Sequence, residues 1–291
     1  MLRGGGREKL MRKVLLVALF GLIFLAGLSV LLYPVISDSL SSRKHTQTIQ
    51  QYLQAVESMS QQDFTDLFEA AHEYNKRLLS KPNRYEMTEE DMAEYRGLLD
   101  LAGLGVIGML EIEEININLP IYHGTDEGVL QIGLGHLEGS SLPVGGPGTH
   151  AVITGHRGLP SSTLLTNIDR LIIGDMFKIH VLNETLIYRV DQLIIVEPHE
   201  TASLAITPGA DHCTLVTCTP YGINTHRLLV RGYRISIDEA ESHLRPSRIP
   251  QDARVLTDVR AALLLIVPAF IVVLVVLFIR LRRVYGRGKK R

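Results

Sequence analysis

The chain has 291 residues, of which 46% are hydrophobic and 21% charged, and its formal net charge is −1. The two ends, 1–13 and 280–291, hold 12 of the 30 basic residues and one acid, which leaves 18 basic against 30 acidic residues and a net charge of about −12 in the middle. An acidic middle argues against nucleic-acid binding, and roughly 220 residues between two apolar ends suffice for one stable domain.

The first predicted element is an apolar run over 14–36 that carries no charge. A transmembrane helix needs about 20 such residues, whereas a cleaved signal peptide has a shorter apolar segment of about 7–15 residues. Five basic residues precede the run, and basic flanks stay in the cytoplasm. We therefore expect 14–36 to be an uncleaved membrane anchor behind a cytoplasmic tail, 1–13.

Helical spacing of apolar residues predicts three helices between the anchor and residue 104. The first covers 40–60. The second begins at Ser60 with a loose capping box and ends before Pro82, and the third begins at Thr88 and reaches about Leu99. We expect these helices to lead the chain from the membrane to the following domain and to pack against it.

From about Val106 the pattern changes to short β-branched runs separated by Gly, Pro and Asn, which predict strands. The predicted strands are 106–112, 115–121, 149–154, 176–182, 185–196, 212–218 and 227–237. Seven or eight short strands with few helices between them are typical of a closed barrel or a sandwich. We therefore expect a mainly β domain whose strand-end loops carry the function.

The chain has two cysteines, Cys213 and Cys218, five residues apart in one predicted strand. An odd offset places their side chains on opposite faces, which disfavours a disulfide between them. We expect Cys213 to be a buried apolar residue and Cys218 an accessible thiol. Neither has a Cys or His at zinc-ligand spacing, so we expect no metal and no cofactor.

Three reactive residue types lie at predicted strand ends: Cys218, Arg227 nine residues later, and His156 after strand 149–154. They are the parts of a cysteine acyl-transfer site. A thiolate attacks a carbonyl, an imidazole moves the proton, and a guanidinium, which stays charged, stabilises the developing oxyanion. The sequence predicts an enzyme with Cys218 as nucleophile, His156 as general acid and base, and Arg227 as oxyanion or substrate clamp.

Three further residues are weaker candidates for substrate binding. Thr217 lies next to Cys218, where its hydroxyl or backbone would position a substrate carbonyl. His226 and His136 would line the groove, although a histidine at such a position is more often structural.

A second apolar run, 261–279, lies between Arg260 and the basic tail 280–291. It contains Pro268, which membrane helices tolerate. With basic residues beside both spans, we expect both termini in the cytoplasm and the middle outside the cell.

Three motifs resemble class C sortases, the pilin polymerases of Gram-positive bacteria. They are Thr-Cys-Thr-Pro-Tyr-Gly-Ile-Asn-Thr-His-Arg at 217–227, Thr-Gly-His-Arg-Gly-Leu-Pro at 154–160 and Leu-Pro-Val-Gly-Gly at 142–146. The resemblance covers about 105–235 and the layout with two spans. It implies a closed eight-stranded β-barrel with a Cys–His–Arg site, which falls on Cys218, His156 and Arg227.

The resemblance also implies a reaction and its partners. A pilin subunit with an LPXTG-like sorting signal would be cleaved between Thr and Gly through a thioacyl intermediate, and a lysine of another pilin would accept the acyl group. Two alternatives stay open: a housekeeping sortase that attaches surface proteins to peptidoglycan, and an inactive membrane-tethered scaffold for pilins.

One feature departs from that family. Its members commonly carry a lid with an Asp-Pro pair and an aromatic residue over the catalytic cysteine, whereas 80–95 contains no Asp-Pro pair and the chain has no Trp. We expect a lidless site; the open alternative is that 80–95 covers the site through other contacts. The expected organisation is a tail (1–13), a span (14–36), an extracellular helical segment (37–104), a catalytic barrel (105–237), a linker (238–260), a span (261–279) and a tail (280–291).

Overall fold

The computed structural model describes residues 5–242, together with 270 and 276. All but two residues of the predicted second span, the whole C-terminal tail and most of the predicted linker therefore lie outside the described residues. Of the helices described, α1 alone is long and apolar enough to cross a membrane, judged by length and composition over Val14–Glu57.

Helix α1 (Gly5–Glu57) joins the predicted membrane segment and the predicted helix 40–60 in one element of 53 residues. The sequence between them, Ser-Asp-Ser-Leu at 37–40, contains no Gly or Pro that would stop a helix. The last part of α1 packs on the barrel, where Tyr52 is fully buried and its hydroxyl accepts a hydrogen bond of 2.8 Å from the Leu182 amide.

Helices α2 (Gln61–Ser80) and α3 (Glu89–Gly97) begin at Ser60 and Thr88, as predicted, each with a capping box. In both boxes an Asp three residues after the cap accepts from the cap backbone, while the cap hydroxyl accepts from the Asp amide.

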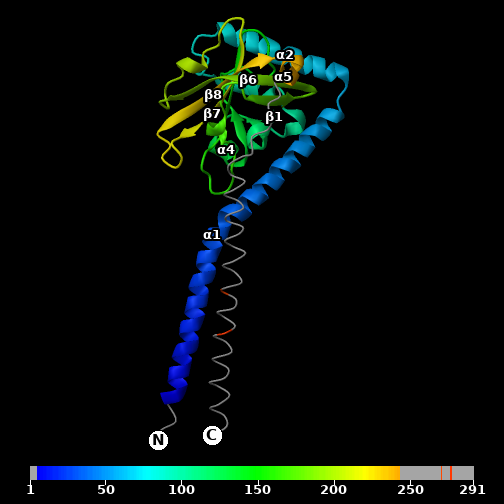
Figure 1. The fold of residues 1–291 in the computed structure, drawn as a ribbon. Helices are drawn as coiled ribbons and strands as arrows, with labels where there is room; N and C mark the ends of the chain where they lie inside the picture. The colour runs from blue at the N-terminus through cyan, green and yellow to red at the C-terminus, as the bar shows by residue number, and fades with distance from the viewer. Residues whose placement is uncertain (1–4, 243–269, 271–275, 277–291) are drawn as a thin grey trace. The chain divides into compact units, whose positions relative to one another are not determined.

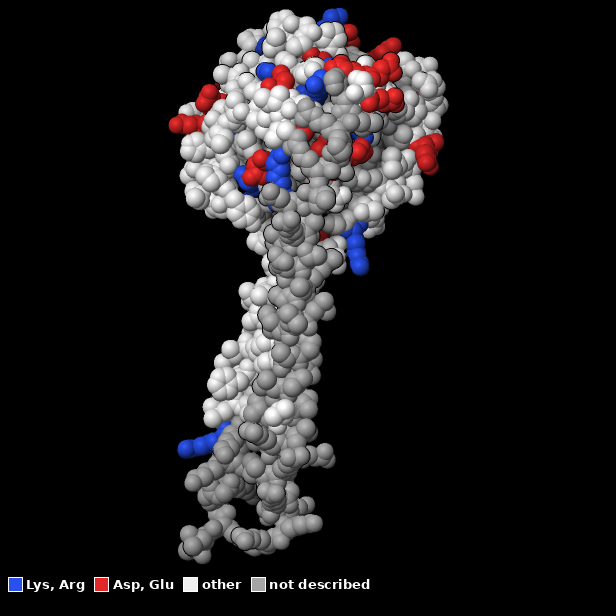
Figure 2. Space-filling view, viewed as in Figure 1, with Lys and Arg blue, Asp and Glu red and all other residues white. Residues whose placement is uncertain are grey.

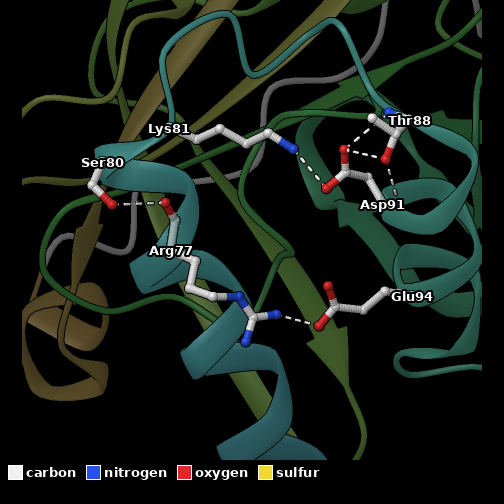
Figure 3. Close-up of polar contacts among 6 residues, drawn as sticks. All are labelled: Arg77, Ser80, Lys81, Thr88, Asp91 and Glu94. Atoms are coloured by element: carbon white, nitrogen blue, oxygen red, sulfur yellow. Dashed lines mark hydrogen bonds and ion pairs between the residues drawn. The ribbon is translucent and has the colours of Figure 1, made fainter.

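Two ion pairs join the end of α2 to α3 (Figure 3). Lys81 Nζ lies 2.6 Å from Asp91 Oδ1, and Arg77 pairs with Glu94. The chain between the helices is thereby held as a short connection over 81–88, which contacts the barrel.

The eight strands close into a barrel in the order β1-β2-β3-β4-β7-β8-β6-β5 (Figure 1), so the predicted closed barrel is confirmed. The strands are β1 (Val106–Ile112), β2 (Ile117–His123), β3 (Leu134–His136), β4 (Thr149–Thr154), β5 (Met176–Val181), β6 (Glu184–Val196), β7 (Asp211–Thr219) and β8 (His226–Ile235). Two short helices, α4 (Glu127–Ile132) and α5 (Ile237–Ser242), and four 3-10 turns complete this part of the chain.

Strand pairing determines which loops share one end of the barrel. Strands β4 and β7 are parallel, and β8 runs antiparallel to β7. The end of β4, the end of β7 and the start of β8 therefore meet at the same end, although they are far apart in the sequence.

The described apolar residues form a main core and two smaller clusters. The main core fills the barrel and extends to the inner faces of the N-terminal helices. One smaller cluster consists of Val152 of β4, Val196 of β6, Leu229 of β8 and Leu204 of the connection between β6 and β7. The other consists of Ile187, Ile235 and Ala240. On the face in Figure 2, acidic and basic residues are interspersed over the barrel and the helices packed on it, whereas the visible part of the apolar segment of α1 is mostly uncharged.

Candidate active site

The two cysteines lie on opposite faces of β7, as their odd offset predicts. Cys213 is fully buried and Cys218 is half-buried, and both are free thiols. Burial raises the pKa of the Cys213 thiol well above its ordinary value, so this residue stays protonated and inert. Cys218 is the cysteine that can react.

Arg227 stands directly across the β7–β8 ladder from Cys218, as its antiparallel partner. Its Nη1 donates to the carbonyls of Asn224 (3.4 Å) and His226 (3.2 Å). Within residues 5–242 no carboxylate pairs with the Arg227 guanidinium, so its charge can meet an anion that forms on a bound substrate.

His156 follows β4 and is brought to Cys218 by the parallel pairing with β7. The Gly155 amide donates to Val216 O (3.1 Å), and the Thr217 hydroxyl donates to Gly155 O (2.7 Å). These bonds anchor the residue before His156 to the two residues before Cys218. The His156 side chain is 26% exposed, and its Nε2 lies 3.7 Å from Glu127 Oε1 of α4.

Arg157 connects the loop that carries His156 to the residue that follows Cys218. Its side chain is only 9% exposed, pairs with Asp169 and donates from Nη1 to Thr219 Oγ1 (3.2 Å). Thr219 follows Cys218 and Thr217 precedes it, so the contacts of Arg157 and Thr217 hold the end of β7 on both sides of Cys218. The sequence reasoning missed this role of Arg157, for which its position beside His156 was the available signal.

Cys218, His156 and Arg227 line one cavity of about 380 Å³. Its other lining residues are Thr125, Leu130, Leu137, Val152, Thr154, Gly155, Val196, Glu197, Pro198, Glu200, Thr201, Leu204, Val216, Thr217 and Leu229. Several are two residues apart on a strand, as Val216 and Cys218 are, or Arg227 and Leu229. Side chains two residues apart on a strand share a face, so counting in steps of two from Cys218 or Arg227 identifies part of this lining from the sequence.

One wall of the cavity is the connection between β6 and β7, which the sequence reasoning did not assign to the site. Two contacts from outside hold it. Arg84 Nη2, from the connection between α2 and α3, donates to Leu204 O at 2.7 Å. His150 Nδ1 donates to Ala205 O at 3.0 Å, and burial lowers the pKa of this histidine to about 4, so it is neutral at pH 7.

The three weaker candidates lie in different environments. Thr217 lines the cavity, but its hydroxyl is buried and already donated to Gly155 O. His226 is exposed at the start of β8, where its Nδ1 lies 2.9 Å from Thr225 Oγ1, and it is not among the cavity-lining residues.

His136 lies in the interior and does not line the cavity. Its Nε2 donates to Ser141 O (2.8 Å), and its Nδ1 lies 2.9 Å from Tyr95 Oη. Burial lowers its pKa to about 4. His136, the last residue of β3, is therefore a neutral buried residue that packs against α3.

None of the residues 80–95 is among those lining the cavity. Arg84 instead contacts the cavity wall from behind, and the exposed Tyr85 ring lies beside the Arg84 guanidinium. A lidless site stays a prediction.

Comparison with known proteins gives consistent matches. Residues 110–235 match the family model described as Sortase domain. Sortase C1 from Streptococcus agalactiae is 47% identical, with 65% of this chain and 98% of that chain covered and a TM-score of 0.64. Sortase C from Streptococcus pneumoniae is 43% identical, with 65% and 97% covered and a TM-score of 0.60. Sortase D from Bacillus subtilis is 29% identical over 132 residues, 44% of this chain and 64% of that relative, so the chain spans less than two thirds of that curated relative.

Proposed function

Because the chain belongs to the sortase family, we propose that it is a cysteine transpeptidase that cleaves an LPXTG-like sorting signal and transfers it to a lysine of a pilin subunit. The observation that carries this proposal is the convergence of Cys218, His156 and Arg227 on one cavity. The similarity to sortase C from Streptococcus pneumoniae, whose structure is described in terms of pilin substrate specificity, supports pilin as the substrate class.

The cavity suits the apolar start of such a signal. Val152, Val196, Leu204 and Leu229 form an apolar cluster that contributes to its lining. Its volume of about 380 Å³ lies in the range of sites that enclose a small ligand. With Leu and Pro in this cavity, the Thr carbonyl of the signal would lie at Cys218.

In the acylation step, the Cys218 thiolate attacks the Thr carbonyl carbon and forms a C–S bond. The negative charge that develops on the carbonyl oxygen is stabilised by the Arg227 guanidinium, opposite Cys218. When the C–N bond breaks, protonated His156 gives its proton to the leaving glycine amine. A thioester and a free amine result.

In the second step, a lysine amine attacks the thioester. Neutral His156 takes a proton from the attacking nitrogen, the C–S bond breaks, and the Cys218 thiolate leaves. The product is an isopeptide bond, and His156 is again protonated for the next cycle.

For the membrane arrangement we propose spans at 14–36 and 261–279, both termini in the cytoplasm, and a catalytic barrel at 105–237 outside. The apolar N-terminal part of α1 and the basic flanks of both runs support this arrangement.

The test uses the full chain in detergent with an LPXTG peptide and a lysine-bearing pilin domain, and product masses are followed. We expect a ligated product that disappears in Cys218→Ala, by roughly 10⁴-fold or more in rate, and persists in Cys213→Ala. Hydrolysis without ligation would contradict the pilin acceptor. A folded chain that cleaves no peptide would overturn the enzyme proposal and favour a scaffold, whereas unchanged activity in Cys218→Ala would overturn Cys218 as the nucleophile.

A further inference from the structure

We propose that the catalytic end of the barrel rests on the lipid surface, and that the connection between β7 and β8, residues 220–225, contacts the lipid headgroups. This inference rests on the proposed N-terminal span. It concerns where the active site lies, not which bond it forms.

The first observation is a direct link between α1 and the histidine loop. The amide and the hydroxyl of Thr163 both donate to Asp38 Oδ1, at 2.7 and 2.8 Å. Asp38 lies two residues beyond the apolar run 14–36, which corresponds to about 3 Å along a helix. The headgroup layer is roughly 5–7 Å thick on each side of the hydrocarbon core, so Thr163 lies at headgroup depth.

The second observation connects this depth to the active site. Thr163 belongs to the loop that carries His156, and the Leu165 amide donates to His156 O (3.2 Å). Gly158 belongs to the same loop. The ring of Tyr221, from the β7–β8 connection, packs against it, and a Cβ added at Gly158 would lie 3.2 Å from the ring. The loop after His156 therefore contacts α1 on one side and the β7–β8 connection on the other.

The third observation is the composition of that connection. Tyr221 is 61% exposed and Ile223 is 68% exposed, although both are large and apolar. Tyr at the boundary between lipid and water, beside an aliphatic side chain, is typical of a membrane-surface contact.

Neighbouring residues of α1 fit the same depth. Tyr33, near the end of the apolar run, is 55% exposed, as an interfacial aromatic residue would be in the protein alone. Arg43 and Lys44 are exposed about one and a half turns beyond Asp38, where they would attract anionic lipids. Lipid is therefore the occupant that these observations favour.

The test uses tryptophan as a depth reporter, because the chain has none of its own. Full-length Ile223→Trp is reconstituted in vesicles of phosphatidylcholine and phosphatidylglycerol, with or without bromine on the acyl chains near the glycerol. The matched control is Ile237→Trp, an Ile that is 61% exposed beyond the other end of β8. Leu25→Trp reports on the apolar run itself.

We expect brominated lipid to lower Ile223→Trp emission by roughly a factor of two and to leave Ile237→Trp nearly unchanged. Adding Asp38→Ala to Ile223→Trp removes the link to Thr163, and we expect the quenching to fall toward the value of Ile237→Trp. Asp38→Asn, which keeps an acceptor oxygen, should retain it.

Quenching of Leu25→Trp without quenching of Ile223→Trp would overturn the inference and leave the span standing. Unquenched Leu25→Trp would overturn the span and the inference together. A change in Ile223→Trp emission that follows added pilin domain and not lipid would identify the connection as a protein contact instead. The proposed reaction is tested by the ligation assay, in which the Cys218-dependent product would be missing. Its failure is thereby distinguished from failure of the lipid contact.

Discussion

Arg84→Ala is expected to weaken binding of the sorting signal without reducing the reactivity of Cys218. Arg84 does not line the cavity, but its guanidinium holds Leu204 O, and Leu204 forms part of the cavity wall. Without this bond, the wall between β6 and β7 keeps the His150 contact and loses its link to the N-terminal helices.

The expected size of the effect follows from the contact. A hydrogen bond from a charged donor contributes about 1.5–3 kcal/mol, and Arg84 is half-exposed, so the lower value of about 1.5 kcal/mol applies. The bond holds the wall in place before the peptide binds. Without it, ordering the wall costs the binding step about the same free energy, which raises KM by roughly tenfold because about 1.4 kcal/mol is one factor of ten.

The assay measures kcat and KM for an LPXTG peptide, together with the rate of Cys218 alkylation by iodoacetamide. The matched control is Arg77→Ala, which breaks the pair with Glu94 between the same two helices but does not contact the wall (Figure 3). In Arg84→Ala we expect a raised KM and an unchanged rate of Cys218 alkylation. In Arg77→Ala we expect KM and the alkylation rate to stay near the wild-type values. An unchanged KM in Arg84→Ala, or an equal rise in Arg77→Ala, would refute the reasoning.

Two further predictions concern stability. Thr217→Val leaves the buried Gly155 carbonyl without its hydrogen-bond donor, which costs about 1–3 kcal/mol of stability and roughly 3–10 °C in Tm. Thr217→Ser keeps the hydroxyl and should melt near the wild-type Tm. Equal Tm values for Thr217→Val and the wild type would contradict the assigned bond. Burial lowers the pKa of His136 and of His150 to about 4, below the ordinary 6.5, so the unfolded chain binds more protons between these values. The free energy that these neutral histidines contribute to folding is present above about pH 6.5 and is lost as the pH falls toward 4. The free energies of unfolding from guanidinium titrations at about pH 7 and pH 5 should therefore differ by a few kcal/mol. Equal free energies at the two pH values would contradict this effect.

The regular parts of the fold could be predicted from local pattern. The predicted strands 106–112 and 149–154 coincide with β1 and β4, and both capping boxes begin their helices at the expected residues. The pattern does not predict α1 as one helix, because the change from apolar to amphipathic character after residue 36 indicates a boundary there. Strand β3 was missed because three residues are too few to show alternation.

The candidate site divides in the same way. The convergence of Cys218, His156 and Arg227 could be predicted, because each lies at the end of a recognisable strand. The link from Arg84 to Leu204 joins residues 120 positions apart and depends on how the α2–α3 connection packs, which no local pattern encodes. The interior position of His136 depends on β3, so a sequence reading without β3 could not place it.

The pairing of Cys218 with Arg227 across one ladder has a consequence for engineering. Their separation is set by backbone hydrogen bonds between two adjacent strands, and the six residues at 220–225 that join those strands take no part in it. Side-chain exchanges in this hairpin tip should consequently change the surface beside the site while the backbones of Cys218 and Arg227 keep their spacing, provided that the backbone at Asn224, whose carbonyl accepts from the Arg227 guanidinium, keeps its position.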